Sequence, residues 1–225
     1  MAEPTSPLPG LVQDDNVLHQ NVLHQNVLHR ISEELAARFQ GVFTPETVER
    51  YVFESYTGLA RSAKIRAHLP AITSRFAKDR LTALAQSKGL AAKDVPEVLF
   101  VCVHNAGRSQ MAAALLAHHA QGRIHVRSAG SMPSEHLEQS AVAAMQEIGL
   151  GLEEEFPKPL TDDVVRAADV VVTMGCGDSC PVYAGKRYLD WHLEDPAGKT
   201  VEQAPAIRDD LDTRTRGLLN DILDR

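Results

Sequence analysis

The chain has 225 residues, 44% of them hydrophobic, and this length suits one medium-sized domain together with a smaller one. The net charge of -7 is uneven, because residues 1–96 hold 11 Lys and Arg against 10 Asp and Glu, whereas residues 97–225 hold 12 against 20. This acidic C-terminal part excludes nucleic acid and anionic membrane as general partners, so any anionic ligand there requires a local binding device. The sequence has no signal-like N-terminus and no apolar run of 18 residues, which predicts a cytoplasmic protein. It has only three cysteines, and in a reducing compartment we expect their thiols to serve catalysis rather than structural disulfides.

Residues 16–30 repeat one pentapeptide three times, as NVLHQ-NVLHQ-NVLHR. Five residues of an α-helix turn through about 500°, so the side chains of His19, His24 and His29 would point in different directions. An odd interval also alternates faces in a strand, and neither geometry collects three imidazoles at one metal ion. The repeat is therefore interpreted as an extension of the first helix or as a loose tail, with residues 1–27 set apart from the folded domains.

Three amphipathic helices are predicted within residues 28–90. The first follows apolar residues at helical spacing from Leu28 and stops near Gly41. The second begins at Thr44-Pro45-Glu46, which supplies an N-cap, a first-turn proline and a first-turn acid, and the third covers about 70–87. Because this predicted bundle has no clustered ionisable residues, we interpret it as an interaction or oligomerisation module, one that can support a homodimer.

Short β-branched runs alternate with helical segments after the linker at 90–96. The runs cover 98–103, 124–128, 170–174 and, more weakly, 186–191, and the helical segments cover 109–120, 135–149, 161–168 and 204–223. This alternation predicts an α/β domain over 96–225, a doubly wound four-stranded parallel sheet with right-handed crossovers. In such a domain ligands bind at the carboxyl ends of the strands.

A Cys-x5-Arg-Ser segment lies at that predicted place, between the first strand and the helix that follows it. Glycine and asparagine within it tolerate the left-handed turns that would wrap the loop into a cradle of backbone N–H groups at a helix N-terminus. Arg108 can pair with two oxygens of a tetrahedral oxyanion, while Cys102 is placed as a nucleophilic thiolate to which Ser109 donates. The residues expected to bind the oxyanion are Val103, His104, Asn105, Ala106, Gly107, Arg108 and Ser109.

The stretch VLFVCVHNAGRSQMA resembles the phosphate loop of the low-molecular-weight protein tyrosine phosphatase family. Gln110-Met111 looks like the arsenate reductase branch, where the phosphatase branch usually has proline. Similar landmarks follow in the family's order, as RSAG (127–130), ADVVVTMGC (168–176) and LDWHLEDPAG (189–198). The helical N-terminal part looks like an extension attached to some actinobacterial-type members, so the resemblance implies an arsenate reductase that also accepts phosphate or sulfate as mimics.

The resemblance also implies a role for each further site residue. Asp195 matches the general acid of the family's Asp-Pro pair, kept protonated by the neighbouring negative charge. Cys176 matches the second cysteine, which attacks the Cys102 sulfur, and Cys180 would then attack Cys176 and leave a disulfide for thioredoxin to reduce. Cys176 and Cys180 are closer together here than in the best-known thioredoxin-coupled members.

Several alternatives remain open at this stage. The chain can be a phosphatase, although Ala197 replaces the tyrosine that commonly follows the Asp-Pro pair, or an oxyanion-responsive binding protein. It can also be a reductase that uses Cys102 alone, with mycothiol and a redoxin as the external reductant. Zinc is a weaker alternative, with Cys176, Cys180, His192 and His104 as ligands.

A further departure concerns potassium, which some members of the family bind beside the loop through acidic side chains. The corresponding positions hold Ala113 and Lys158, whereas Asn105 and Ser128 are retained. The Lys158 ammonium is therefore predicted to take the cation's place and stiffen the loop. No bound cofactor or metal ion is expected.

Overall fold

The computed structural model describes residues 11–63, 68–175 and 180–224. Within these ranges it contains seven helices and four strands, in the order α1 (Leu11–Arg38), α2 (Pro45–Ala60), α3 (Leu69–Ser87), β1 (Glu97–Cys102), α4 (Arg108–Ala120), β2 (His125–Gly130), α5 (Gln139–Gln146), α6 (Asp162–Ala167), β3 (Val170–Met174), β4 (Arg187–Asp190) and α7 (Ala204–Leu223). None of the described helices is long and apolar enough to cross a membrane.

The first helix is longer than its apolar pattern indicates. α1 begins at Leu11, so the pentapeptide repeat lies inside this helix, which agrees with the interpretation of the repeat as an extension of the first helix and not with a loose tail over residues 11–27. The repeat contains no glycine or proline, so no residue in it interrupts a helix that has started.

The last two histidines of the repeat contact α2. His24 Nδ1 lies 2.9 Å from the Tyr56 hydroxyl, and His29 Nδ1 lies 3.0 Å from a carboxylate oxygen of Glu49. The repeat therefore helps α1 to pack against its neighbour in the bundle. Thr44 caps α2 as predicted, because its hydroxyl oxygen accepts a hydrogen bond from the backbone N–H of Thr47.

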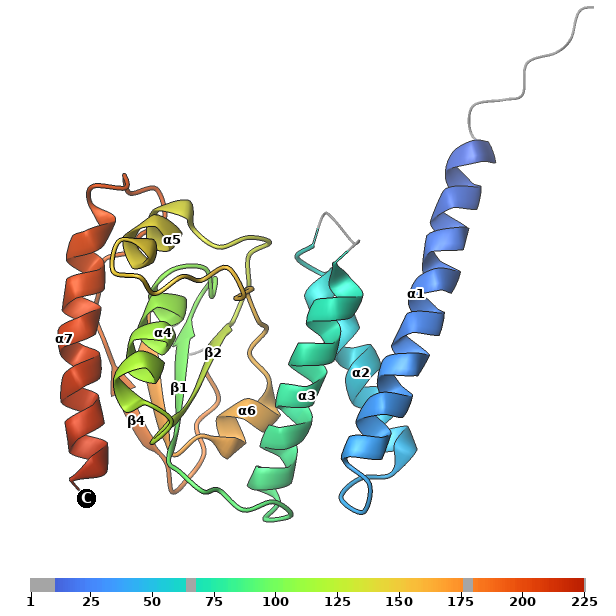
Figure 1. Cartoon of the computed structure of the whole chain (residues 1–225), viewed down its shortest axis with the longest axis horizontal. Coiled ribbons are helices and arrows are strands. Elements are labelled where there is room, and N and C mark those ends of the chain that lie inside the picture. The colour runs from blue at the N-terminus through green and yellow to red at the C-terminus, as the bar shows by residue number, and fades with distance from the viewer. Residues whose placement is uncertain (1–10, 64–67, 176–179, 225) are drawn as a thin grey trace, which may run out of the picture.

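All four strands are parallel, in the order β2-β1-β3-β4. One face of the sheet packs against α4, α5 and α7, which lie on the left in Figure 1. The other face packs against α6, and Ala83 of α3 joins the same apolar cluster. The prediction of a doubly wound four-stranded sheet preceded by a three-helix bundle is confirmed.

The bundle is attached to the α/β domain through α3, which lies between α2 and α6 (Figure 1). Arg80 of α3 forms an ion pair of 3.1 Å with Asp163 of α6, and the two side chains are only 8% and 5% exposed. Ser55 and Glu54 of α2 also accept hydrogen bonds from the Arg80 guanidinium. Because separating a buried ion pair leaves an unpaired buried charge, this contact fixes α3 against the α/β domain.

Candidate functional site

The Cys-x5-Arg-Ser segment forms a loop between the carboxyl end of β1 and the first turn of α4, as predicted. Cys102 is buried at 2% exposure, and its Sγ lies 3.0 Å from Ser109 Oγ. The backbone N–H of Asn105 also donates to this sulfur, at 3.2 Å. Two donors and the N-terminus of α4 therefore surround the sulfur, an arrangement that stabilises a thiolate.

Asn105 determines the shape of this loop. Its φ angle of 49° is left-handed, a conformation that asparagine tolerates better than most residues. Its side-chain Nδ2 donates to Ser109 Oγ at 2.8 Å, which leaves the Ser109 hydroxyl hydrogen available for the Cys102 sulfur. Its Oδ1 accepts the backbone N–H of Lys158 at 2.8 Å. A single side chain thus connects Ser109, whose hydroxyl contacts the sulfur, to a segment 53 residues after Asn105.

Gln110 is a site residue that the sequence indicated only as a mark of the reductase branch. Its side chain is 1% exposed, and its Nε2 lies near three acceptors. These are the Asn105 carbonyl at 3.1 Å, Asn105 Oδ1 at 3.0 Å and the Phe156 carbonyl at 2.9 Å. No local pattern reveals this role, because the third acceptor lies on a segment that only the fold brings to α4.

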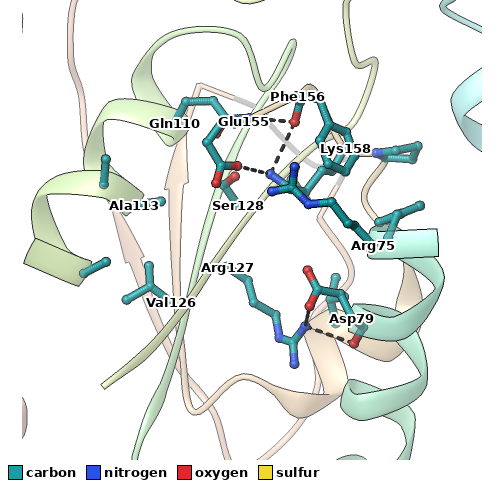
Figure 2. A pocket seen from close by; sticks show the side chains of 16 residues that line it. Arg75, Asp79, Gln110, Ala113, Val126, Arg127, Ser128, Glu155, Phe156 and Lys158 are labelled. Atoms are coloured by element: carbon teal, nitrogen blue, oxygen red, sulfur yellow. Dashed lines mark hydrogen bonds and ion pairs between the residues drawn. The ribbon is translucent and has the colours of Figure 1, made fainter. Parts of the chain in front are cut away.

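The positions compared above with the family's potassium site lie behind the loop. Ala113, Ser128 and Lys158 line one cavity of about 190 Å³ behind the loop (Figure 2). Lys158 holds Asn105 through its backbone N–H, whereas its ammonium binds Glu155 Oε2 and the Phe156 carbonyl. The Lys158 charge therefore stabilises the segment that carries this backbone donor.

Asp195 lies at the mouth of the loop, where the sequence pattern placed it. Its carboxylate forms an ion pair with the Arg108 guanidinium and accepts the backbone N–H of Ala197 at 3.0 Å. Ser140 of α5 holds the following residue by donating to the Pro196 carbonyl at 3.1 Å. A small hollow at this point is lined by Cys102, His104, Gly107, Arg108, Glu138 and Asp195. The geometry places the Asp195 carboxyl group beside the Arg108 guanidinium and in the same hollow as the Cys102 sulfur.

The second cysteine of the predicted relay, Cys176, lies outside the described residues. The residue before it, Gly175, has a left-handed φ of 72°. A Cβ atom placed on Gly175 would lie 3.3 Å from Arg108 Nη1, so the chain passes the loop immediately before Cys176.

Cys180 lies in the apolar cluster on the α6 face of the sheet, whereas Cys102 belongs to the cluster on the α4 face. Tyr188 of β4 holds the residues that follow Cys180, since its hydroxyl donates to the Pro181 carbonyl and accepts the N–H of Tyr183. Burial, and secondarily the electrostatic interaction with Cys180, raise the pKa of Tyr188. The structure therefore brings Cys102, Arg108 and Asp195 together and places Cys180 on the other side of the sheet.

No group of three side chains suited to a metal ion is found among the described residues. Of the histidines considered as zinc ligands, His104 is exposed at the edge of the loop, and His192 is 93% exposed, with its Nε2 3.6 Å from Asp190.

Gly130, the last residue of β2, lies so close to the backbone of the loop that no side chain fits between them. A Cβ atom at this position would lie 2.8 Å from the Val103 carbonyl oxygen and 2.9 Å from the Asn105 nitrogen, both of them backbone atoms. Gly130→Ala is therefore expected to displace the loop, destabilise the protein by about 1–3 kcal/mol and weaken phosphate binding roughly tenfold. Denaturant unfolding and phosphate titration measure the two effects.

Gly217→Ala is the matched control for this prediction. Gly217 lies inside α7, and a Cβ atom there meets no atom within 4 Å. Since alanine favours a helix by roughly 0.5–1 kcal/mol over glycine, this variant should be slightly more stable and should bind phosphate unchanged. Equal phosphate affinity in both variants would contradict the close approach described for Gly130.

Two family models match the chain. The model described as "Protein-tyrosine-phosphatase-like, N-terminal domain" matches residues 28–85, and "Low molecular weight phosphotyrosine protein phosphatase" matches residues 97–225. Among solved structures, the Corynebacterium glutamicum thioredoxin-dependent arsenate reductase Cg_ArsC1' is 51% identical, with a TM-score of 0.81, and the match covers 90% of this chain and 100% of that one.

Two curated relatives match a part of the chain. The glutaredoxin arsenate reductase of Synechocystis sp. is 32% identical over 129 residues, which cover 56% of this chain and 98% of the relative. The arsenate reductase of Brevibacillus brevis is 30% identical over 122 residues, 53% of this chain and 90% of the relative.

Proposed function

The chain belongs to the low molecular weight phosphotyrosine protein phosphatase family, and from this membership we propose that it reduces arsenate to arsenite with thioredoxin as electron donor. The observation that carries the proposal is the 51% identity to a thioredoxin-dependent arsenate reductase along 90% of the chain. The site geometry supports it, because Cys102, Arg108 and Asp195 line one hollow.

In the first step the Cys102 sulfur attacks the arsenic atom of arsenate. A sulfur–arsenic bond forms and one arsenic–oxygen bond breaks, and the departing oxygen leaves as water with a proton from Asp195. Arg108 and the loop N–H groups bind the remaining oxygens of the adduct. Cys102 is well placed for this step, because Ser109 and the N–H of Asn105 already donate to its sulfur.

In the second step the Cys176 thiolate attacks the Cys102 sulfur. A Cys102–Cys176 disulfide forms, and the electron pair of the sulfur–arsenic bond stays on arsenic, which leaves as arsenite in the trivalent state. Cys180 then attacks Cys176, which returns Cys102 to the thiolate and leaves a Cys176–Cys180 disulfide. The dithiol of thioredoxin reduces this disulfide and is itself oxidised. For Cys180 to take part, residues 181–183 must leave the hydrogen bonds that Tyr188 makes with them.

The proposal is tested by the identity of the electron donor. Arsenate-dependent NADPH consumption is measured with thioredoxin and thioredoxin reductase, and in parallel with mycothiol and its redoxin. We expect turnover with the thioredoxin system. Turnover with mycothiol alone would remove the three-cysteine relay and leave a reductase that uses Cys102 only, and no turnover with either donor would contradict arsenate reduction.

We further propose that Lys158 makes the loop independent of potassium. Its ammonium holds Glu155 and the Phe156 carbonyl and thereby fixes the backbone N–H that binds Asn105. Exchanging sodium for potassium at constant ionic strength is therefore expected to change the rate of arsenate reduction less than roughly twofold. Lys158→Met is expected to lower the rate in both salts. A several-fold rise of the wild-type rate in potassium would contradict this role.

A further inference from the structure

The N-terminal bundle contacts a short segment, residues 154–158, that runs directly behind the oxyanion loop. Arg75 of α3 donates to the Glu154 carbonyl at 2.7 Å, and its guanidinium lies 5.4 Å from the centre of the Phe156 ring. Phe156 is 9% exposed and belongs to an apolar cluster otherwise made by the bundle, with Leu59, Leu69 and Phe76 as its buried members. The position of Phe156 is therefore determined by the bundle.

The same segment binds the loop from its other side. The Phe156 carbonyl accepts Nε2 of Gln110 at 2.9 Å, and the Lys158 N–H donates to Asn105 Oδ1 at 2.8 Å. Gln110 is buried, and among the described residues its Oε1 has no hydrogen-bond partner. A buried glutamine with an unsatisfied oxygen is costly, and the compensation visible in the structure is that the two hydrogens of its nitrogen share three acceptors.

These contacts form a continuous path from the bundle to the nucleophile. It runs from Phe76 and Arg75 to Phe156, from Phe156 through Gln110 to Asn105, and from Asn105 to the Cys102 sulfur. Figure 2 shows its central part, where Arg75, Phe156 and Lys158 approach Gln110 across the cavity behind the loop. The last contacts are the Asn105 N–H at 3.2 Å from the sulfur and Asn105 Nδ2 at 2.8 Å from Ser109 Oγ.

From this path we propose that the N-terminal bundle positions the oxyanion loop, with Phe156 and Gln110 as positioning residues for Cys102. The effect on arsenate turnover rests on the proposed function, whereas the effects on anion binding and thiol reactivity do not. The bundle is thus a part of the catalytic unit that orders the loop from behind, in addition to any contact it makes with other molecules.

The test compares two phenylalanines of equal burial. Phe156 and Phe39 are both 9% exposed, but Phe39 packs within the cluster formed by α1, α2 and α3 that does not include Phe156. Each is changed to leucine in the full chain carrying Cys176→Ser and Cys180→Ser, so that Cys102 is the only thiol. Unfolding temperature, phosphate dissociation constant and the pH profile of Cys102 alkylation by iodoacetamide are measured for both.

Phe156→Leu is expected to weaken phosphate binding and slow alkylation at neutral pH, each by roughly threefold or more, with the alkylation profile moved to higher pH. Phe39→Leu should lower the unfolding temperature to a similar degree and leave both site measurements within about 1.5-fold of the parent. Equal changes in both variants, or none in Phe156→Leu, would overturn the proposal.

A second variant tests the loop end of the path without altering the bundle. Gln110→Met keeps the length of the side chain and removes the amide donor, so it should weaken phosphate binding and slow alkylation by about tenfold. Unchanged values in a folded Gln110→Met protein would overturn the role of Gln110. If all these site measurements behave as expected but the unmodified chain does not reduce arsenate, the proposed function fails while the positioning stands.

Discussion

Cys102→Ser is expected to reduce arsenate turnover by at least about 1,000-fold, to the background of the assay. The serine hydroxyl stays protonated at neutral pH, and the donors at Ser109 and Asn105 that stabilise a thiolate give an alcohol no comparable reactivity. The measurement is arsenate-dependent NADPH consumption with the thioredoxin system, together with direct detection of arsenite.

Phosphate binding is the control for this variant. The loop N–H groups and Arg108 are unchanged in Cys102→Ser, so the variant should still bind phosphate and unfold at a temperature close to that of the parent. Arsenite production at more than about a hundredth of the parent rate would show that Cys102 is not the nucleophile.

Cys176→Ser is expected to abolish arsenite release driven by thioredoxin, by roughly 100-fold or more. Without a thiol at this position, the Cys102–arsenate adduct has no internal partner to receive the sulfur, and only slow attack by an external thiol remains. Anion binding should not change, and any phosphatase turnover should stay nearly intact, because phosphate release needs water and not a second cysteine. The measurement is NADPH consumption beside hydrolysis of a small aryl phosphate.

Cys180→Ser is the matched variant, because it interrupts the relay one step later. It should release one equivalent of arsenite for each protein chain and then stop, with a Cys102–Cys176 disulfide that mass spectrometry of a tryptic digest identifies. Continued thioredoxin-driven turnover by Cys180→Ser would show that Cys180 is dispensable. Continued turnover by Cys176→Ser would contradict the relay altogether.

The order of elements and the position of the loop were predictable because their signals are contiguous in the chain. Thr44-Pro45 begins α2, β-branched runs form the buried strands, and the Cys102 loop follows the first strand directly. Asp195 was expected at the site from the family resemblance, and the structure places it beside Arg108 at the edge of the sheet where parallel strands bring their carboxyl ends.

The sequence left open whether α1 includes the repeat, because the repeat has a weak apolar pattern. Apolar periodicity indicates the part of a helix that packs against other elements. Residues that precede this part can continue the same helix when they include no glycine or proline. The region from Leu11 to Leu28 meets this condition, so the helix extends through it.

By itself the sequence determined the strands of the sheet, the helices of the bundle and the loop that places Cys102, Arg108 and Ser109, since each of these has its signals in neighbouring residues. Only the tertiary structure decided that the bundle packs behind this loop. The contacts responsible join residues far apart in the sequence, such as Arg80 with Asp163, 83 positions apart, and Gln110 with Phe156, 46 apart. A charged or amide side chain carries no local sign that it will be buried, because its burial depends on a partner that the folded chain supplies.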